Sequence, residues 1–257
     1  MHALAPAKIN AFLKITGTRG NYHEIISRFI KLPNLYDTIT FEPQKKKKEF
    51  ILEGEFGCKT EQNTIYKVYQ KLLEISDQKK IENFFKVHKV IVDKQIPSFA
   101  GLGGGSSDAA TFLRMCNDYI ELGLSTQALA DLGACVGADI PFFIHDFNVA
   151  NVSGIGDVVT PFEDEHLDFE IFTPNIACDT VAVYKNYREK FFNPITTQDR
   201  RFFASLKTSE ALELYSIERA NDLYNAAKDL YPQLAEHEKK GRFFSGSGST
   251  FFSLKGM

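Results

Sequence analysis

A glycine-rich segment in the middle of the chain constrains the fold most strongly. It runs from Gly101 to Ser107, with the sequence GLGGGSS, and the apolar residues after it predict the start of a helix. Glycines let backbone N–H groups approach a ligand closely, and a helix N-terminus adds partial positive charge. The combination predicts a phosphate site suited to a nucleotide rather than a flexible surface loop.

This segment fits neither of two common phosphate-binding patterns. A P-loop requires a lysine after the last glycine, and here a serine follows. The dinucleotide pattern is met at Gly101 and Gly103, but Ser106 occupies the place of the third glycine or alanine. The segment therefore predicts a third kind of phosphate-binding loop.

Length and composition allow one large domain or two smaller ones. The chain has 257 residues, is 44% hydrophobic and carries a net charge of −3, which gives no global attraction for nucleic acid or an acidic membrane. The basic run Lys45–Lys48 lies between the strand-like segments 37–42 and 49–53, so we expect a solvated hairpin tip.

The cysteines and the termini indicate a cytoplasmic protein. The four cysteines show neither a C-x-x-C pair nor zinc-finger spacing with histidine, which predicts reduced, mostly buried thiols. They are Cys58, Cys116, Cys135 and Cys178, of which the second and third fall on apolar helical faces. The N-terminus lacks the features of a signal peptide, and no run approaches the ~18 apolar residues of a membrane span.

Local patterns predict alternating strands and helices. Alternation near the start places Lys8 and Asn10 on one strand face, opposite the apolar face. Asn63 is expected to cap a helix over 64–75, and a helix from Ser106 to about residue 122 follows the glycines. Residues 138–144 are expected to form a strand, and the chain ends as strand, glycine-rich turn and strand. Between them, helices are expected over 181–190, 209–217, 222–230 and 234–240, and no element is predicted for 194–208.

Three separated motifs resemble those of the GHMP kinase superfamily of small-molecule kinases. They are Pro6–Asn10, the stretch Pro97–Ala110 around the glycines, and Ser245–Ser249. With Tyr22-His23, 137–141 and 154–157, the match is closest to the branch that phosphorylates the 2-hydroxyl of a cytidylyl-methylerythritol in the non-mevalonate route to isoprenoid precursors. The resemblance covers essentially the whole chain.

The resemblance implies an α+β, two-lobed fold with the active site in the cleft between the lobes. We expect residues 1–153 to form the N-terminal lobe and 154–257 the C-terminal lobe. ATP and Mg²⁺ are the implied cofactors, and Ser106 or Ser107 could offer the metal a hydroxyl. The implied partner is the cytidylyl-methylerythritol substrate, without nucleic acid or membrane, and the implied state is a monomer or weak homodimer.

The resemblance also assigns roles to residues. Asp139 matches the catalytic aspartate of the family, as general base, and Lys8 is its electrostatic partner. Asn10, Tyr22, His23 and Tyr184 are implied to bind substrate, the aromatic residues at its cytosine. The implied ATP-binding residues are Pro97, Ser98, Phe99, Ala100, Gly101, Leu102, Gly103, Gly104, Gly105, Ser106 and Ser107. The glycine-rich C-terminal motif comprises Ser245, Gly246, Ser247 and Gly248.

The sequence departs from the family's motifs at two places, and some residues allow another role. Gly20-Asn21 stands where the family usually has Asp-Gly, and Ser98–Ala100 replaces a more glycine-rich stretch. Judged from the residues alone, Asp139 is more often a helix-end or turn aspartate, and Tyr184 fits a packed core equally well. Alternatives for the function are a homoserine, mevalonate or sugar kinase, or a nucleotide-binding protein without catalysis.

Overall fold

Residues 1–45 and 49–256 are described by a computed structural model, in which two compact units interleave along the chain. The first unit comprises Met1–Ala7, Leu32–Ile96 and Gly103–Asp146, and the second comprises Lys8–Lys31, Pro97–Leu102 and the chain from Phe147 onward. The predicted lobes 1–153 and 154–257, and the cleft between them, stay predictions. Three lysines of the expected hairpin tip, at positions 46–48, lie outside the described residues.

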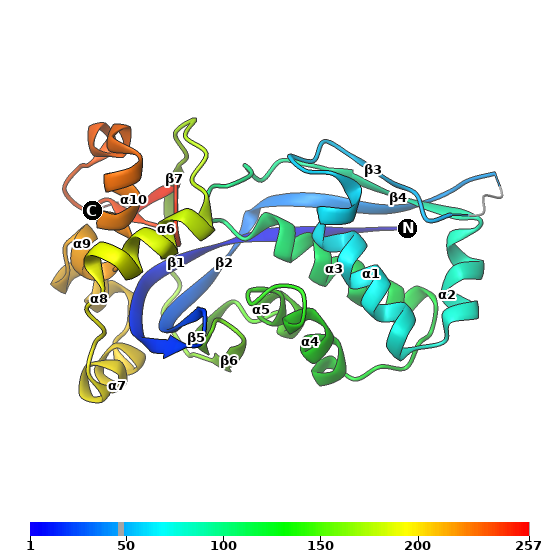
Figure 1. Cartoon of the computed structure of the whole chain (residues 1–257), viewed down its shortest axis with the longest axis horizontal. Coiled ribbons are helices and arrows are strands. Elements are labelled where there is room, and N and C mark those ends of the chain that lie inside the picture. Colours follow the sequence, from blue (N-terminus) through cyan, green and yellow to red (C-terminus); the bar gives the residue numbers. More distant parts are fainter. Residues whose placement is uncertain (46–48, 257) are drawn as a thin grey trace. The chain divides into compact units, whose positions relative to one another are not determined.

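The first unit is a sheet covered by helices. Residues 38–43 of β2 (Tyr22–Pro43) pair antiparallel with β4 (His88–Asp93), and β3 (Leu52–Gly54) pairs parallel with β4. The helices α1 (Thr64–Ile75) and α2 (Gln78–Phe85) connect β3 to β4, and α3 (Gly104–Tyr119) packs beside α1 (Figure 1). Phe41 of β2 contacts Phe85 and Phe112, with ring centroids 5.5 and 5.8 Å apart, so these helices cover the sheet through aromatic packing.

The helices of this unit begin largely where the sequence predicts. The Asn63 side chain accepts a hydrogen bond from the Ile65 N–H at 2.8 Å, which confirms the expected cap of α1. Ser125 caps α4 (Thr126–Ala134) in the same way, through the Ala128 N–H. The strand expected over 138–144 is wrong: α5 (Ile140–His145) occupies it. Pro141 is tolerated in a first helical turn, and a short apolar run that is buried all round has no periodicity to distinguish helix from strand.

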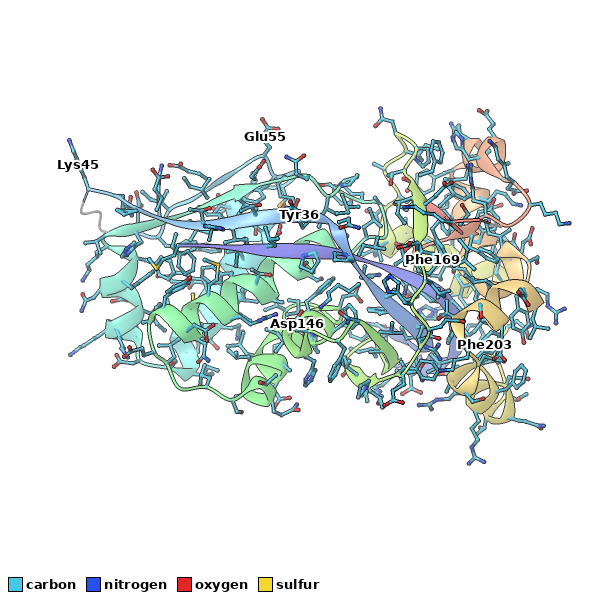
Figure 2. The ribbon with its side chains drawn as sticks, turned by 180° about the vertical axis from the view of Figure 1, so that it is seen from behind. Tyr36, Lys45, Glu55, Asp146, Phe169 and Phe203 are labelled. Carbon is cyan, nitrogen blue, oxygen red and sulfur yellow. The ribbon has the colours of Figure 1, made fainter. Side chains whose placement is uncertain are left out.

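The second unit contains the other half of β2 and a separate small sheet. β1 (His2–Arg19) pairs with β2, residues 25–30 of β2 pair antiparallel with β5 (Val149–Gly154), and β5 pairs with β6 (Val158–Pro161). The small sheet has the order β7 (Phe169–Phe172), β9 (Phe251–Leu254), β8 (Phe243–Phe244), and Figure 2 labels Phe169 at the start of its edge strand. The expected strand, glycine-rich turn and strand at the end of the chain are confirmed.

Helices complete the second unit. Its core includes the fully buried Tyr187, Tyr224 and Phe244. The helical elements are α6 (Thr180–Asn186), a π-helical turn (Tyr187–Phe191), α7 (Thr197–Ser205), α8 (Thr208–Leu214), α9 (Ile217–Ala220), α10 (Tyr224–Leu230) and a 3₁₀ turn (Pro232–His237). A further 3₁₀ turn, Thr60–Gln62, belongs to the first unit.

Helix α7 lies in a stretch for which the sequence predicts no element. Thr196 and Asp199 form a reciprocal capping box at its start. Phe203, labelled in Figure 2, packs against Phe12 with ring centroids 5.2 Å apart and stacks on Tyr215 at 4.9 Å. The buried Arg28 guanidinium donates to the Ala204 and Leu206 carbonyls at 3.2 and 3.0 Å, which holds the end of α7 to β2.

The expectation of mostly buried cysteines is half right. Cys116 and Cys178 are buried, whereas Cys58 and Cys135 are exposed, and all four are free thiols. Cys135 follows the last residue of α4, so its side chain leaves the apolar helical face on which the sequence places it. Within the described residues, no helix combines the length and the apolar character needed to cross a lipid bilayer.

Candidate active site

The glycine-rich segment ends at an uncapped helix N-terminus. Gly103 adopts a left-handed conformation (φ +71°) as the N-cap of α3, and no side chain caps the first turn. The first N–H groups of a helix have no partner within it, so this turn can bind an anion. Thr64 at the start of α1 donates to the Gly105 carbonyl at 2.6 Å, which fixes the turn in place.

The two serines that open α3 differ in accessibility. Ser106 is half-buried, whereas Ser107 is fully buried, and its Oγ has no hydrogen-bond partner among the described residues. Of the two, only Ser106 can therefore reach a ligand at the helix N-terminus.

Asp139 lies in the same unit as the start of α3. It immediately precedes α5, and α5 packs against α3. A Cβ built on Gly137 would lie 3.7 Å from the Ser106 Oγ, so the segment that carries Asp139 runs beside the first turn of α3.

A buried charged cluster, which the sequence analysis missed, fixes the chain before the glycines. The Lys94 Nζ contacts Asp37 of β2 and donates to the Asp108 Oδ2 of α3 at 2.7 Å, while the Asp37 Oδ1 accepts from the Ile96 N–H at 2.8 Å. Asp108 is 3% exposed, and its Oδ1 has no partner within residues 1–45 and 49–256. Burial raises the pKa of Asp108 to about 7, against the attraction of Lys94.

In the second unit, the first motif bonds to the start of the glycine-rich segment. Lys8 and Asn10 lie on β1 and are buried, at 3% and 1% exposure. The Lys8 Nζ donates to the Asn10 Oδ1 at 2.6 Å and to the Gly101 carbonyl at 3.3 Å, and it lies 4.4 Å from the centre of the Phe29 ring. Lys8 and Asn10 share a strand face, as the alternation predicts, but this face is buried as well as the apolar one.

The C-terminal motif packs against the same residues. Ser245 Oγ donates to the Gly101 carbonyl at 2.9 Å and accepts from the Asn10 N–H at 3.1 Å. Gly101 has φ +73°, and a Cβ there would lie 2.1 Å from the Ser245 carbonyl oxygen. A Cβ on Gly246 would lie 3.2 Å from the Asn10 Oδ1. Three motifs that are distant in sequence therefore meet around Gly101 in one unit.

Three polar residues that the sequence analysis missed support this meeting point. Asn221 donates to the Gly246 carbonyl at 2.8 Å, and Ser27 accepts from the Asn10 Nδ2 at 2.9 Å. The Thr180 hydroxyl bonds to that of Ser247 at 2.7 Å. Each comes from an element far from the motif in sequence, so no local signal pointed to it.

An aromatic cluster surrounds His23 in the second unit. Tyr22 is 64% exposed, whereas His23 is 7% exposed. The His23 ring centre lies 5.2 Å from that of Tyr184 and 5.8 Å from that of Tyr187. Burial and the positive charge of Arg188 lower the pKa of His23 below its ordinary value of 6.5, so the imidazole is neutral at pH 7.

Comparison with known proteins identifies the family. A sequence model described as the GHMP kinases N terminal domain matches residues 63–147, which include the start of α3 and Asp139. A protein of Sulfurimonas denitrificans named 4-diphosphocytidyl-2-C-methyl-D-erythritol kinase is 53% identical over 254 residues, covering 98% of this chain and 96% of that relative. The chain belongs to the GHMP kinase family. It is an ATP-dependent phosphotransferase.

Two further relatives agree. A protein of the same name from a Sulfurovum species is 48% identical over 252 residues, covering 98% of both chains. The crystal structure of a 4-(cytidine 5'-diphospho)-2C-methyl-D-erythritol kinase is similar with a TM-score of 0.75 and 29% identity, covering 99% of this chain and 90% of that one. The expected α+β fold of GHMP kinases is thereby confirmed.

The residues at the start of α3 are compatible with Mg²⁺. Within the part of the chain that the structure describes, no three His, Cys, Asp or Glu side chains form a metal-binding group. Mg²⁺ commonly binds through one or two protein oxygens, water and the substrate phosphates, so it does not require such a group. The accessible hydroxyl of Ser106, beside an anion-binding helix N-terminus, offers an oxygen of the suitable kind.

Proposed function

We propose that this GHMP kinase transfers the γ-phosphoryl group of ATP to the 2-hydroxyl of 4-(cytidine 5'-diphospho)-2-C-methyl-D-erythritol, in the non-mevalonate route to isoprenoid precursors. The full-length similarity to proteins named for this activity supports the proposal. The observation that carries it is the pairing of an exposed Tyr22 with a neutral, buried His23 beside Tyr184. Homoserine and mevalonate have no base that would require such a group.

The cytosine is the part of the substrate that this cluster suits. An exposed aromatic ring such as Tyr22 can stack on a pyrimidine. A nitrogen of a neutral imidazole can donate or accept, depending on the tautomer, so it can hydrogen-bond a polar base edge. The His23 Nε2 is buried and has no partner among the residues described, so a ligand hydrogen bond would satisfy it. Tyr184 contributes the second aromatic surface, and Asn10 contributes to substrate binding from β1.

The glycine-rich segment would bind the phosphates of ATP. In the segment Pro97–Leu102, the carbonyls of Ala100 and Gly101 accept hydrogen bonds from Thr250 and Ser245. The N–H groups of residues 103–106 have no partner within α3 and would bind the phosphates, whereas the Ser107 N–H already donates to the Gly103 carbonyl at 2.9 Å. Positioning and charge neutralisation account for most of the catalysis in phosphoryl transfer, so an amide-lined anion site is the central requirement. Mg²⁺ held by the Ser106 hydroxyl and the phosphates would neutralise part of the phosphate charge.

Asp139 and Lys8 would act on the reacting hydroxyl. Asp139 serves as general base, which accepts the proton as the oxygen attacks phosphorus. Lys8 serves as the electrostatic partner, because its ammonium can stabilise the negative charge that develops on that oxygen. The hydrogen bonds from Lys8 to Asn10 and to the Gly101 carbonyl hold the ammonium in place, so it would need little reorientation to act in this way. We further propose lobes 1–153 and 154–257, a cytoplasmic location and a monomer or weak homodimer that binds neither nucleic acid nor membrane.

A coupled ADP-release assay tests the substrate. The purified protein is given ATP, Mg²⁺ and either the cytidylyl substrate, mevalonate or homoserine, with Asp139→Asn as the control for contaminating kinases. We expect turnover with the cytidylyl substrate alone, at a rate roughly 10²–10⁴-fold lower in the variant. Turnover with mevalonate or homoserine but not with the cytidylyl compound refutes the substrate, and ATP binding without any turnover refutes the catalytic role.

A further inference from the structure

Arg188 contacts the turn that carries the proposed base-recognition residues. It lies in the π-helical turn Tyr187–Phe191 that directly follows α6. The Arg188 Nη2 donates to the carbonyls of Gly20 and Tyr22, each at 3.3 Å. The Tyr22 carbonyl belongs to the peptide bond that leads into His23. The Arg188 guanidinium therefore bonds to both sides of the turn between β1 and β2, and its second contact is to the residue directly before His23.

The helical spacing places Arg188 among the partners of His23. Tyr184, Tyr187 and Arg188 follow at i, i+3 and i+4, which puts them on one helical face, and the rings of both tyrosines contact His23. π-Helical turns are rare and occur frequently at functional sites. Arg188 Nε is buried without a hydrogen-bond partner in the described part of the chain, and so is His23 Nε2. Two polar atoms of the cluster therefore have hydrogen-bonding capacity that the described residues leave unused.

We propose that Arg188 is a positioning residue for base recognition, which holds the turn presenting Tyr22 and His23 and selects the uncharged imidazole as the form that meets the substrate. The inference rests on the proposed function for the identity of the base. A guanidinium is positively charged at every physiological pH. Its charge therefore disfavours a second positive charge on the neighbouring His23 imidazole. The uncharged ring keeps one nitrogen that can accept a hydrogen bond from the base, whereas the protonated ring can only donate.

The other groups that surround His23 are neutral or already paired, so Arg188 is the charged group that acts on its imidazole. Burial raises the pKa of Tyr187 to about 12, so its hydroxyl remains neutral. Phe192 contributes an apolar ring at 6.3 Å, and Tyr184 faces His23 with its ring. On the strand of His23 itself, Glu24 is paired with Arg19 at 2.8 Å. The pKa of His23 is lowered by burial first and by Arg188 second, in agreement with this arrangement.

Nuclear magnetic resonance measures the effect on His23 without any substrate. The chain has six histidines, and a His23→Ala variant assigns the relevant resonance. We expect Arg188→Gln to raise the pKa of His23 towards about 6.5, while Arg188→Lys keeps it low. Lys185→Gln is the matched control, because Lys185 is an exposed cation three residues before Arg188, on α6, and is paired with Glu189 at 3.9 Å. Equal His23 pKa values in Arg188→Gln and Lys185→Gln would overturn the proposal.

Steady-state kinetics separate positioning from mere folding. In the wild type, the KM for the cytidylyl substrate should rise as the pH falls through the pKa of His23. Arg188→Gln should move this inflection to higher pH and raise the KM roughly tenfold at pH 8, with the KM for ATP unchanged. Arg188→Lys should raise the KM without moving the inflection, which keeps the test available should Arg188→Gln not fold. An unchanged KM in the lysine variant contradicts the positioning role.

The two proposals fail in different ways. If the wild type does not phosphorylate the cytidylyl substrate, the proposed function is wrong, and the substrate-free titration of His23 still decides whether Arg188 controls its protonation. If the wild type is active and the His23 pKa is the same in Arg188→Gln as in the wild type, the role of Arg188 alone is refuted.

Discussion

Gly101→Ala tests whether the meeting of the three motifs holds the nucleotide loop. Gly101 has φ +73°, and the new Cβ would lie 2.1 Å from the Ser245 carbonyl oxygen, where no real Cβ fits. That oxygen belongs to the backbone, so a side-chain rotation cannot relieve the clash. Either the loop or the C-terminal motif must move.

The expected cost has two parts. A left-handed conformation costs an alanine about 1–2 kcal/mol. Movement of the loop also weakens the hydrogen bonds that the Gly101 carbonyl accepts from Lys8 and Ser245, each worth about 1 kcal/mol. The sum is a loss of about 3–4 kcal/mol in the free energy of unfolding.

Gly241→Ala isolates the first part. Gly241 lies in the same unit with φ +75°, and its Cβ would meet nothing within 4 Å. Urea unfolding should therefore show a loss of about 1–2 kcal/mol in Gly241→Ala and roughly twice that in Gly101→Ala. Only Gly101→Ala should raise the KM for ATP. Equal unfolding free energies in the two variants, with an unchanged KM for ATP, would refute the inferred contact.

Four other substitutions test the catalytic role of Asp139, the buried charge of Asp108 and the recognition of the cytosine. Asp139→Asn should lower kcat roughly 10²–10⁴-fold with little change in the KM for ATP, and near wild-type turnover would exclude it as base. Because the pKa of Asp108 is raised to about 7 in the folded state, folding keeps a proton on this carboxyl that the unfolded chain releases near pH ~3.9. The contribution of Asp108 to stability should therefore fall as the pH rises from about 4 to 7, by up to about 1.4 kcal/mol per pH unit. Asp108→Asn should lack that slope, as urea unfolding across this range measures. His23→Ala and Tyr22→Ala should each raise the KM for the cytidylyl substrate roughly ten- to a hundredfold and spare that for ATP.

The sequence predicts features whose physical cause is local. The cap at Asn63 and the helix after the glycines depend on a few adjacent residues, and the structure contains both of them. The helix over residues 140–145 was missed because buried helices and buried strands present the same uninterrupted apolar run. The run is short and contains a proline, and neither feature clearly favours a helix over a strand.

The parts of the site that sequence analysis missed depend on long-range partners. Asn221 bonds to Gly246 and Lys94 to Asp108 only because the fold brings them together. Arg188 is an ordinary helix-surface cation in the sequence, and nothing nearby marks it as a partner of the turn before His23. Residues of this kind are found from their hydrogen bonds, and not from their spacing.

Phe99 shows how the fold tolerates a departure from a glycine-rich loop. It has φ +55° and an exposed side chain, although a bulky residue rarely adopts this conformation. The Phe99 carbonyl accepts from the Cys178 N–H at 3.2 Å, and the next carbonyl, of Ala100, accepts from the Thr250 N–H at 3.1 Å. Backbone hydrogen bonds on both residues thus hold a turn that glycine would otherwise adopt without strain. The shape of the phosphate loop therefore depends on the strand and helix ends that surround it as well as on its own glycines.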